Sequence, residues 1–341
     1  MRRAMGSRQG PAINVEPANS QPRESPLVLV TGATGFVGSA LVRSLALHGD
    51  HGVRAAVRRD GPELDGRTQR VLVRDLAADT DWSAALVGVD AVVHTAARVH
   101  VMRDVALDPL TAYRQTNVEG TLALARQAAA AGVRRFVFLS SVKVNGERTL
   151  SGQAFRADDE PRPEDASGVS KMEAEMGLRL IAAQTGLEVV IIRPPLVYGP
   201  GVKANFATMM RWLRRGLPLP LEAISNQRSL VAIDNLTDLI AVCLRHPGAV
   251  NQTFMASDGD DLSTTALLRR LGTALGRPAR LWAIPSPLLT ACAAMVGRRD
   301  MAQRLLDSLQ VDIDKTRRIL SWSPPVSVDD GLLRVARAFV R

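Results

Sequence analysis

The stretch from Leu27 to His48 constrains the fold more than any other part of this chain. A short apolar run at 27–30 leads into the glycine-rich turn TGATGFVG at 31–38, and apolar side chains at helical spacing predict a helix over 36–48. Such a turn lets the backbone approach a pyrophosphate, and the start of the helix adds free N–H groups and a positive dipole end. A tight turn alone would also need glycines, but the flanking strand and helix favour a dinucleotide-binding unit. The expected contacts are Gly32, Thr34, Gly35, Phe36, Val37 and Gly38.

The remainder of the first 200 residues alternates between short apolar runs and helical stretches. Strands are expected at 53–57, 70–73, 91–94, 136–139 and 189–192. This alternation predicts an α/β fold, a Rossmann-type doubly wound parallel sheet with a smaller C-terminal substrate-binding domain. We expect a tail without fixed structure at 1–25 and a dinucleotide-binding domain at 26–200. Residues 201–341 are expected to form mainly the substrate-binding domain, with room for segments that return to the sheet.

Composition and charge limit the class of protein. Hydrophobic residues make up 46% of the 341 residues and charged residues 23%, which is ordinary for a globular chain. The net charge of +9 comes from arginines that are spread along the chain and mixed with acids, without interleaved aromatic residues, so a nucleic-acid binder is disfavoured. Cys243 and Cys292 lack the paired spacing of a disulfide framework or a zinc site. We therefore expect no metal and a reducing, cytoplasmic location.

Two features bear on export and membranes. Arg2 and Arg3 resemble the start of a signal peptide, but no apolar stretch of the necessary length follows them. The longest apolar run, 284–296, contains Pro285 and Pro287 and is too short to span a bilayer. We expect this run to form a buried helix of the second domain rather than a membrane contact.

Arg58 bears on which dinucleotide binds. It lies twenty residues beyond Gly38, at the end of the second expected strand, where an acidic residue would receive the ribose hydroxyls of NAD. An arginine can instead pair with the 2′-phosphate of NADP, although a solvated charge is the competing interpretation. Asp60 keeps NAD open, and Asp75, after the third strand, is placed either to meet the adenine or to cap a helix. The sequence thus allows NAD or NADP and slightly favours NADP.

Several motifs follow one another along the chain. They are TGATGFVG at 31–38, HTAA at 94–97, Asn117, the serine pair at 140–141, the Ser170–Lys171 pair and RPPLVYGP at 193–200. In this combination the sequence resembles the extended short-chain dehydrogenase/reductase superfamily, above all its NAD(P)-dependent nucleotide-sugar epimerases, dehydratases and 4-reductases, over about residues 27–335. The resemblance implies further dinucleotide contacts at Asp75, Leu76, Thr95, Ala96, Ala97, Lys171 and Pro194.

The catalytic set of that superfamily, a Ser or Thr, a Tyr and a Lys, is incomplete here. The resemblance assigns Ser141 to the sugar oxygen and Lys171 to the nicotinamide ribose, with the lysine charge lowering the pKa of the proton-transfer group. The tyrosine belongs four residues before Lys171, on the same helical face, where this chain has Ser167. A serine hydroxyl reaches less far and ionises less readily than a tyrosine. We favour a helix N-cap or an exposed small residue at Ser167 over an efficient serine base, and Ser170 with Glu173 fits a capping box.

A nucleotide sugar brings a diphosphate, which calls for positive charge in the second domain. By resemblance, Arg228 matches an arginine that grips this diphosphate, although an arginine at a strand start is the competing interpretation. Lys203 and Asn205 lie in a segment that resembles the one meeting uracil and phosphates. Asn117 resembles a helix asparagine near the active site, and with Ser141 it completes the expected contacts to a UDP-sugar; it could also mend a helix kink. Relatives often pair through two helices, so a homodimer is compatible with the sequence.

Two functions fit these residues. The first is a cytoplasmic NAD(P)-dependent nucleotide-sugar 4-epimerase or 4-keto reductase, which transfers hydride at the sugar C4. The segment 141–147 resembles enzymes of surface-polysaccharide sugar synthesis. The second is a regulatory module that binds dinucleotide and sugar nucleotide but has impaired catalysis because of Ser167. Loss of one general acid/base costs about 10²–10⁴ in rate, so residual turnover is compatible with either function.

Overall fold

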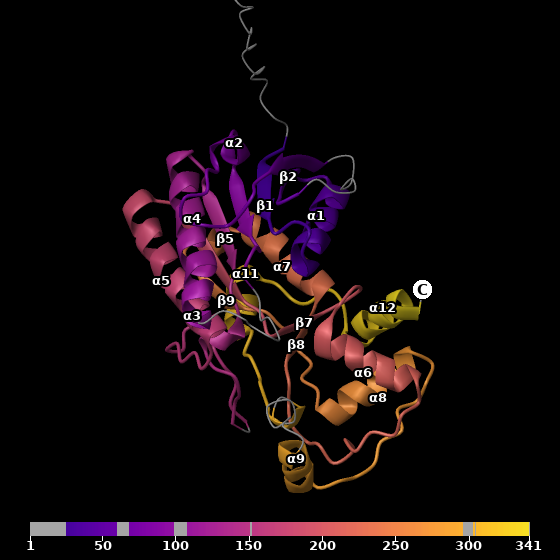
Figure 1. Cartoon of the computed structure of the whole chain (residues 1–341). Coiled ribbons are helices and arrows are strands. Elements are labelled where there is room, and N and C mark those ends of the chain that lie inside the picture. The colour runs from indigo at the N-terminus through magenta and orange to yellow at the C-terminus, as the bar shows by residue number, and fades with distance from the viewer. Residues whose placement is uncertain are drawn as a thin grey trace, which may run out of the picture.

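The computed structural model describes residues 25–59, 68–98, 108–150, 152–295, 303 and 305–340. The tail expected at 1–25, apart from its last residue, and Asp60 lie outside this part of the chain. Within it, seven strands form one parallel sheet in the order β3-β2-β1-β4-β5-β6-β9 (Figure 1). These strands are β1 (Leu27–Thr31), β2 (Gly52–Val57), β3 (Thr68–Leu72), β4 (Ala91–His94), β5 (Arg135–Leu139), β6 (Glu188–Arg193) and β9 (Thr253–Met255).

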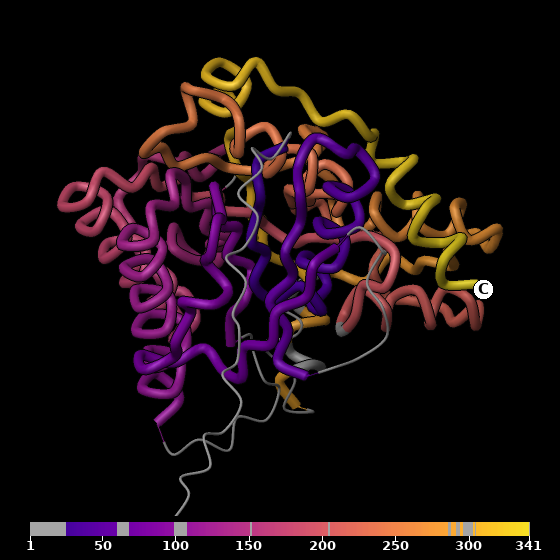
Figure 2. Tube along the Cα trace, turned by 90° about the horizontal axis from the view of Figure 1, so that it is seen from above, coloured from indigo at the N-terminus to yellow at the C-terminus, as the bar shows by residue number. Residues whose placement is uncertain are grey.

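Helices cover both faces of this sheet (Figure 2). On one face lie α1 (Phe36–His48), α7 (Ile233–Arg245) and α11 (Asp314–Leu320). On the other lie α2 (Ser83–Leu86), α4 (Thr121–Ala130) and α5 (Ala166–Thr185). The short α3 (Pro109–Tyr113) continues through the π-helical turn η1 (Arg114–Gly120) into α4. The predicted doubly wound parallel sheet is confirmed.

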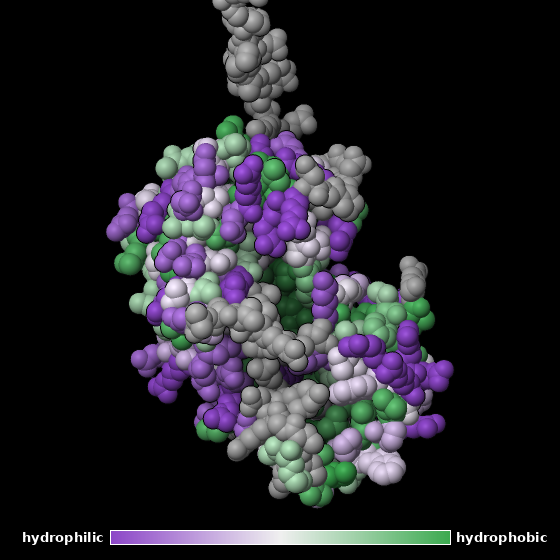
Figure 3. Space-filling model, in the orientation of Figure 1, coloured by the Kyte–Doolittle hydropathy of each residue, from purple (hydrophilic) through white to green (hydrophobic). Residues whose placement is uncertain are grey.

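A second lobe packs around its own apolar cluster below the carboxyl ends of the strands. It contains α6 (Ala204–Arg214), α8 (Thr264–Ala274), α9 (Ser286–Met295) and α12 (Val328–Val340). The parallel pair β7 (Leu196–Tyr198) and β8 (Leu230–Ala232) lies between the lobes, and the 3-10 turns η2 (Val142–Val144) and η3 (Pro247–Ala249) complete the elements. Although β9, α7 and α11 follow residue 200, they pack on the sheet. Figure 3 shows that the surface is hollowed between the two lobes.

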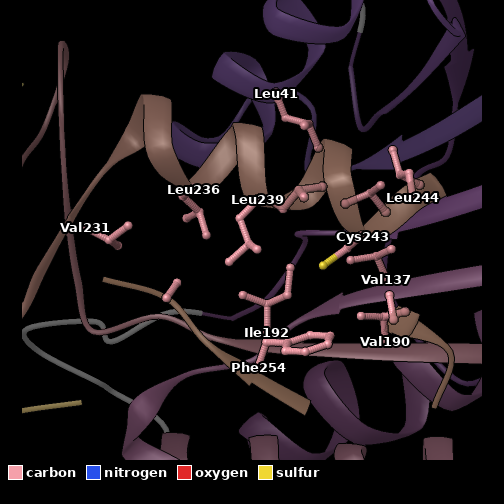
Figure 4. Close-up of a cluster of buried hydrophobic side chains, with 14 of the residues drawn as sticks. Leu41, Val137, Val190, Ile192, Val231, Leu236, Leu239, Cys243, Leu244 and Phe254 are labelled. Atoms are coloured by element: carbon pink, nitrogen blue, oxygen red, sulfur yellow. The ribbon is translucent and has the colours of Figure 1, made fainter. Parts of the chain in front are cut away.

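The core on the α7 side explains why that helix returns to the sheet. Leu239 and Cys243 of α7 pack among Ile192, Val137 and Phe254 of three strands (Figure 4). All five are essentially inaccessible to solvent. Burying an aliphatic or aromatic side chain of this kind contributes about 1.5–3 kcal/mol. Burial also raises the pKa of the Cys243 thiol, so this cysteine packs as a protonated apolar residue.

The apolar run near residue 290 does form a helix, α9, but the expectation that it is buried is wrong. Leu288 and Met295 are exposed, while Leu289 packs on the apolar cluster of the second lobe. Composition predicted burial, yet no other element covers this side of α9 within the described residues. Over that same part of the chain, no helix combines the length and apolar character needed to cross a membrane.

Candidate active site

The glycine-rich turn is shaped by close backbone approaches. Gly32 has a φ of +66°, and a Cβ there would lie 2.8 Å from the Ala96 nitrogen. A Cβ at Gly38 would lie 2.2 Å from the Gly32 carbonyl oxygen, which accepts a 2.8 Å hydrogen bond from the Gly35 N–H. Glycine is therefore required at positions 32 and 38 by the packing of turn, helix and the loop after β4. A Cβ at Gly35 would come only to 3.1 Å from that same oxygen.

The start of α1 has the features of an anion site. Its N-cap is Gly35, which offers no side chain to bond the first N–H groups, and the first turn holds no acidic residue. Thr34 and Gly35 are exposed, while Phe36 and Val37 are half-buried. The first backbone N–H groups of a helix lack intrahelical partners and meet the positive end of its dipole. These features fit the phosphates of a dinucleotide.

His94 joins the turn to α4 and the loop after β4. Its fully buried ring lies 2.7 Å from the Thr31 hydroxyl through Nδ1 and 2.9 Å from the Thr121 hydroxyl through Nε2. Thr95 donates its hydroxyl to the Thr31 carbonyl at 2.6 Å, and the Ala96 N–H lies 3.3 Å from the Thr31 hydroxyl. Desolvation, helped by the charge of Lys171, lowers the pKa of His94 to about 3. A neutral imidazole thus positions the half-buried Thr95 and Ala96 beside Gly32.

The buried His94 should make the protein acid-labile. Its pKa is lowered in the folded state, so the unfolded chain binds more protons and stability falls as the pH drops from 6.5 towards about 3. The expected loss from this group is about 1.4 kcal/mol per pH unit. We expect His94→Gln to show a shallower loss of unfolding free energy over that range in urea titrations. Parallel curves for wild type and variant would remove His94 as the cause.

Asn117 connects the loop after β4 with α5. It lies in the π-helical turn η1, fully buried, where its Oδ1 accepts from the Arg98 N–H at 2.8 Å. Its Nδ2 donates to the Arg98 carbonyl at 3.2 Å and to the Ser170 hydroxyl at 3.0 Å. The side chain thus bonds to other segments instead of mending its own helix. Asn117 is a positioning residue for the loop that carries Ala97.

The beginning of α5 differs from the sequence prediction. Asp165 is the N-cap and accepts from the Gly168 N–H at 2.7 Å, so the alternative of an N-cap at Ser167 is wrong. Ser170 lies inside the helix and donates to the Ser167 carbonyl at 2.8 Å, which also excludes the capping box. Asp165 occupies the N-cap position because it directly precedes the helix, and its carboxylate also pairs with Lys143. Ser167 is half-buried, and within the described residues its hydroxyl makes no hydrogen bond.

Lys171 lies one turn after Ser167. Its Nζ donates to the Leu139 carbonyl at 2.8 Å and lies 4.4 Å above the centre of the Phe138 ring. Desolvation lowers the pKa of Lys171 to about 8, although Glu175 opposes the shift. The ammonium therefore prevails at pH 7 and lies at the carboxyl end of β5.

Ser141 lies at the same end of β5. It is half-buried, and its Oγ accepts from the Lys143 N–H at 3.2 Å. The Lys143 side chain bonds to Asp165 and, at 3.1 Å, to Glu147. Burial disfavours the ammonium of Lys143, but these two carboxylates outweigh it and raise its pKa. Lys143 thus ties the segment after Ser141 to the start of α5.

A buried ion pair beneath this site was missed by sequence reasoning. Glu175, one turn after Lys171, receives two hydrogen bonds from Arg193, of 2.9 and 2.6 Å, and one of 2.6 Å from the Ser140 hydroxyl. Arg193 also donates to Asn145 at 3.0 Å. Both charged side chains are almost fully buried. The pair holds β5, β6 and α5 together next to Ser141. The position of Glu175 one helical turn after Lys171 is the sequence feature that could have indicated this buried acid.

Both tyrosines of the chain are buried and lie outside the start of α5. Tyr198 is fully buried and donates its hydroxyl to Asp258 at 2.7 Å, while desolvation and that carboxylate raise its pKa. Tyr113 is buried at the end of α3, with the Arg98 guanidinium 5.7 Å from its ring centre. Tyr198 is thus held protonated in the second lobe's cluster, and Tyr113 packs beside η1.

The remaining predicted dinucleotide contacts follow the carboxyl ends of β2, β3 and β6. Arg58 is exposed directly after β2, and Asp75 is exposed in the loop after β3. Asp75 accepts from the N–H of Leu76, and no helix starts there, so the alternative of a helix cap is wrong. Leu76 is buried under Gly120, and the buried Pro194 accepts from the Val142 N–H at 3.0 Å.

The predicted substrate residues lie in the second lobe and its connections. Lys203 and Asn205 are exposed at the start of α6. Arg228 is half-buried, two residues before β8, and its guanidinium donates to the Asp307 carbonyl at 3.0 Å. The segment around it is held by backbone bonds to Leu262 and Leu309. Arg228 is therefore fixed between two strand-like segments of the second lobe.

Comparison with known proteins identifies the family of this chain. Residues 28–255 match the NAD dependent epimerase/dehydratase family. The chain belongs to this family. A UDP-glucose 4-epimerase of Vibrio cholerae is 48% identical over 317 residues, which cover 92% of this chain and 95% of the relative. A 2-alkyl-3-oxoalkanoate reductase of Stenotrophomonas maltophilia is 30% identical, with 90% and 98% covered.

The fold is shared with solved structures. A UDP-glucuronic acid 4-epimerase from Bacillus cereus, in complex with UDP-glucuronic acid and NAD, matches with a TM-score of 0.74 and 23% identity, covering 92% of this chain and 99% of that one. The predicted membership of the epimerase/dehydratase family is confirmed by the family match, and the solved structure shares the predicted fold.

Proposed function

We propose that this protein is an NAD-dependent nucleotide-sugar 4-epimerase acting on a UDP-hexose, slow because Ser167 replaces the tyrosine. The observation that carries the proposal is the placement of Lys171, whose ammonium bonds to the Leu139 carbonyl at the carboxyl end of β5, two residues before Ser141. The 48% identity to a UDP-glucose 4-epimerase supports the choice of epimerase over reductase. We further propose that the product serves surface-polysaccharide synthesis.

The residues present fit NAD. Gly32 and Gly38 let the turn, α1 and the loop after β4 pack closely, and the uncapped start of α1 at the exposed Gly35 fits phosphates. When bound, NAD supplies reversible hydride exchange at the sugar C4. This chain's own residues then divide the remaining tasks: Ser141 orients the C4 oxygen, and the Lys171 ammonium holds the nicotinamide ribose and favours loss of a proton from a nearby hydroxyl.

The slow step is the one that moves the proton of the C4 hydroxyl. The Ser167 hydroxyl lies one helical turn before Lys171, but it is short and its intrinsic pKa is far above that of a tyrosine. We propose that Ser167 or a water molecule relays this proton. Conversion of UDP-glucose to UDP-galactose, followed by chromatography of the sugar nucleotides, tests the activity. Binding of both ligands without any conversion would favour the regulatory module instead.

The dinucleotide can be distinguished at Arg58. The exposed guanidinium after β2 is free to approach a 2′-phosphate, so we propose that NADP is accepted as well as NAD. Arg58→Asp is expected to weaken NADP binding by roughly 10-fold or more, since one charge-assisted contact is worth about 1.5–3 kcal/mol, and to spare NAD. Titration of both dinucleotides into both proteins measures this. A clear preference for NAD in the wild type that the substitution leaves unchanged would refute it.

We propose that Arg228 grips the diphosphate of the substrate. Arg228→Ala removes a charge-assisted contact worth about 1.5–3 kcal/mol, so the affinity for UDP should fall by roughly 10- to 150-fold in calorimetry. Arg269→Ala, in the same lobe but exposed and paired with Glu222, is the matched control and should leave UDP binding unchanged. NAD affinity equal to the wild type shows that both variants remain folded. Unchanged UDP affinity in Arg228→Ala would remove this arginine from the site.

A further inference from the structure

An apolar surface that the proposed reaction does not use lies on the second lobe, around α9. Trp282 is 65% exposed, Leu288 is 53% exposed and Met295 is 79% exposed. In Figure 3, green atoms gather at the lower end of the second lobe, where Figure 1 labels α9. Leu289 of the same helix packs on the lobe's apolar cluster. The helix is thus anchored on one side while large apolar side chains face outward on another.

The segment that leads into α9 carries arginines and no acidic residue. Residues 262–299 include no Asp or Glu, but they include Arg269, Arg270, Arg277, Arg280, Arg298 and Arg299. Arg269 and Arg270 pair with acidic residues. Arg277 and Arg280 are exposed, and neither side chain forms an ion pair with another residue of the described part of the chain. Two exposed arginines are therefore available to an external anion in the segment that leads into α9.

Backbone hydrogen bonds fix the segment that precedes α9. The Leu219 N–H donates to the Arg280 carbonyl at 2.9 Å, and the Trp282 N–H donates to the Leu219 carbonyl at 2.9 Å. Side chains two residues apart in an extended segment point to the same side. Arg280 and Trp282 are therefore presented together, as a cation beside an aromatic ring.

We propose that the surface formed by Arg277, Arg280, Trp282, Leu288 and Met295 docks this protein on an anionic phospholipid bilayer. Tryptophan sits at headgroup depth, aliphatic side chains enter the acyl boundary, and arginines meet anionic headgroups while their stems cover apolar area. A symmetric contact with a second copy would bring the same arginines face to face, and like charges oppose it. One short helix with a few cations gives reversible binding.

Vesicle sedimentation of the full chain tests the docking surface. The wild type should partition onto vesicles of equal parts phosphatidylcholine and phosphatidylglycerol and dissociate from them at high salt. It should not bind vesicles of phosphatidylcholine alone. Arg277→Glu with Arg280→Glu should reduce partitioning by more than about 10-fold, since each cation near an anionic surface contributes appreciably. Trp282→Ser with Leu288→Ser should do the same by removing the apolar contact.

Matched controls use exposed residues of the other lobe. Arg43→Glu with Arg134→Glu makes the same change of charge, and Leu47→Ser with Val87→Ser removes comparable apolar side chains. Both control proteins should bind vesicles as the wild type does. If they lose binding equally, net charge or general stickiness is responsible and the docking surface is wrong.

Quenching by brominated lipids tests which tryptophan reaches the bilayer. Trp82 and Trp322 are buried and Trp212 is half-buried against the second lobe's cluster, so most lipid quenching should come from the exposed Trp282 and disappear in Trp282→Phe. Quenching that persists in this variant would overturn the proposed orientation. Absence of vesicle binding by the wild type, or lipid-free self-association that the Arg277/Arg280 variant abolishes, would overturn the proposal, the latter by assigning the surface to a second copy.

Discussion

Ser167→Tyr is expected to raise the rate of C4 epimerisation by about 10²-fold or more, because a missing general acid/base costs about 10²–10⁴. The substitution places a longer arm with a more acidic hydroxyl one helical turn before Lys171. Burial lowers the pKa of Lys171 to about 8, so at pH 7 its ammonium is present to lower the pKa of that hydroxyl. Ser167 is half-buried, and Asp165 caps the helix without it, so the larger side chain leaves the cap intact.

Single-turnover hydride transfer with UDP-glucose measures this gain. Ser167→Phe is the matched control, since it adds nearly the same volume without the hydroxyl and should remain as slow as the wild type. Ser167→Tyr combined with Lys171→Met should lose most of the gain, because the tyrosine then lacks its neighbouring charge. If the wild type is already fast and Ser167→Tyr changes nothing or slows it, another group carries the proton.

Gly35→Val should abolish NAD binding while the protein stays folded. The backbone at Gly35 has φ −76° and ψ 174°, which any residue adopts, and its Cβ would meet only the Gly32 carbonyl oxygen at 3.1 Å. The added methyl groups instead occupy the exposed space at the start of α1, where phosphates meet the free N–H groups. We expect NAD affinity to fall by roughly 10²-fold or more, because several charge-assisted hydrogen bonds are lost together.

Gly38→Ala distinguishes a loss of binding from a loss of folding. A Cβ at Gly38 would lie 2.2 Å from the Gly32 carbonyl oxygen, so this smaller substitution should destabilise the fold by about 1–3 kcal/mol. Thermal unfolding and NAD titration on the same samples separate the two effects. Equal NAD affinity in the wild type and a folded Gly35→Val protein would contradict a dinucleotide site at this turn.

Local patterns determined much of the fold. Strand Ala91–His94 and helix Phe36–His48 have the predicted bounds. Residues close in sequence define the ends of these elements, as the glycine-rich turn does for the start of α1. The third strand is displaced, at Thr68–Leu72 instead of 70–73, since β3 is an edge strand with few buried side chains to define its ends. The glycines of the turn and the spacing between Ser167 and Lys171 also follow from sequence alone.

Contacts between distant segments could be decided only by the tertiary structure. The pairing of Glu175 with Arg193, the bridge that His94 makes between Thr31 and Thr121, and the choice of Asp165 as a cap depend on which elements meet in space. The exposure of α9 is of the same kind. An apolar run indicates a helix whose burial would be favourable. Whether another element covers the helix depends on segments distant in sequence, and here no described element covers its outer side.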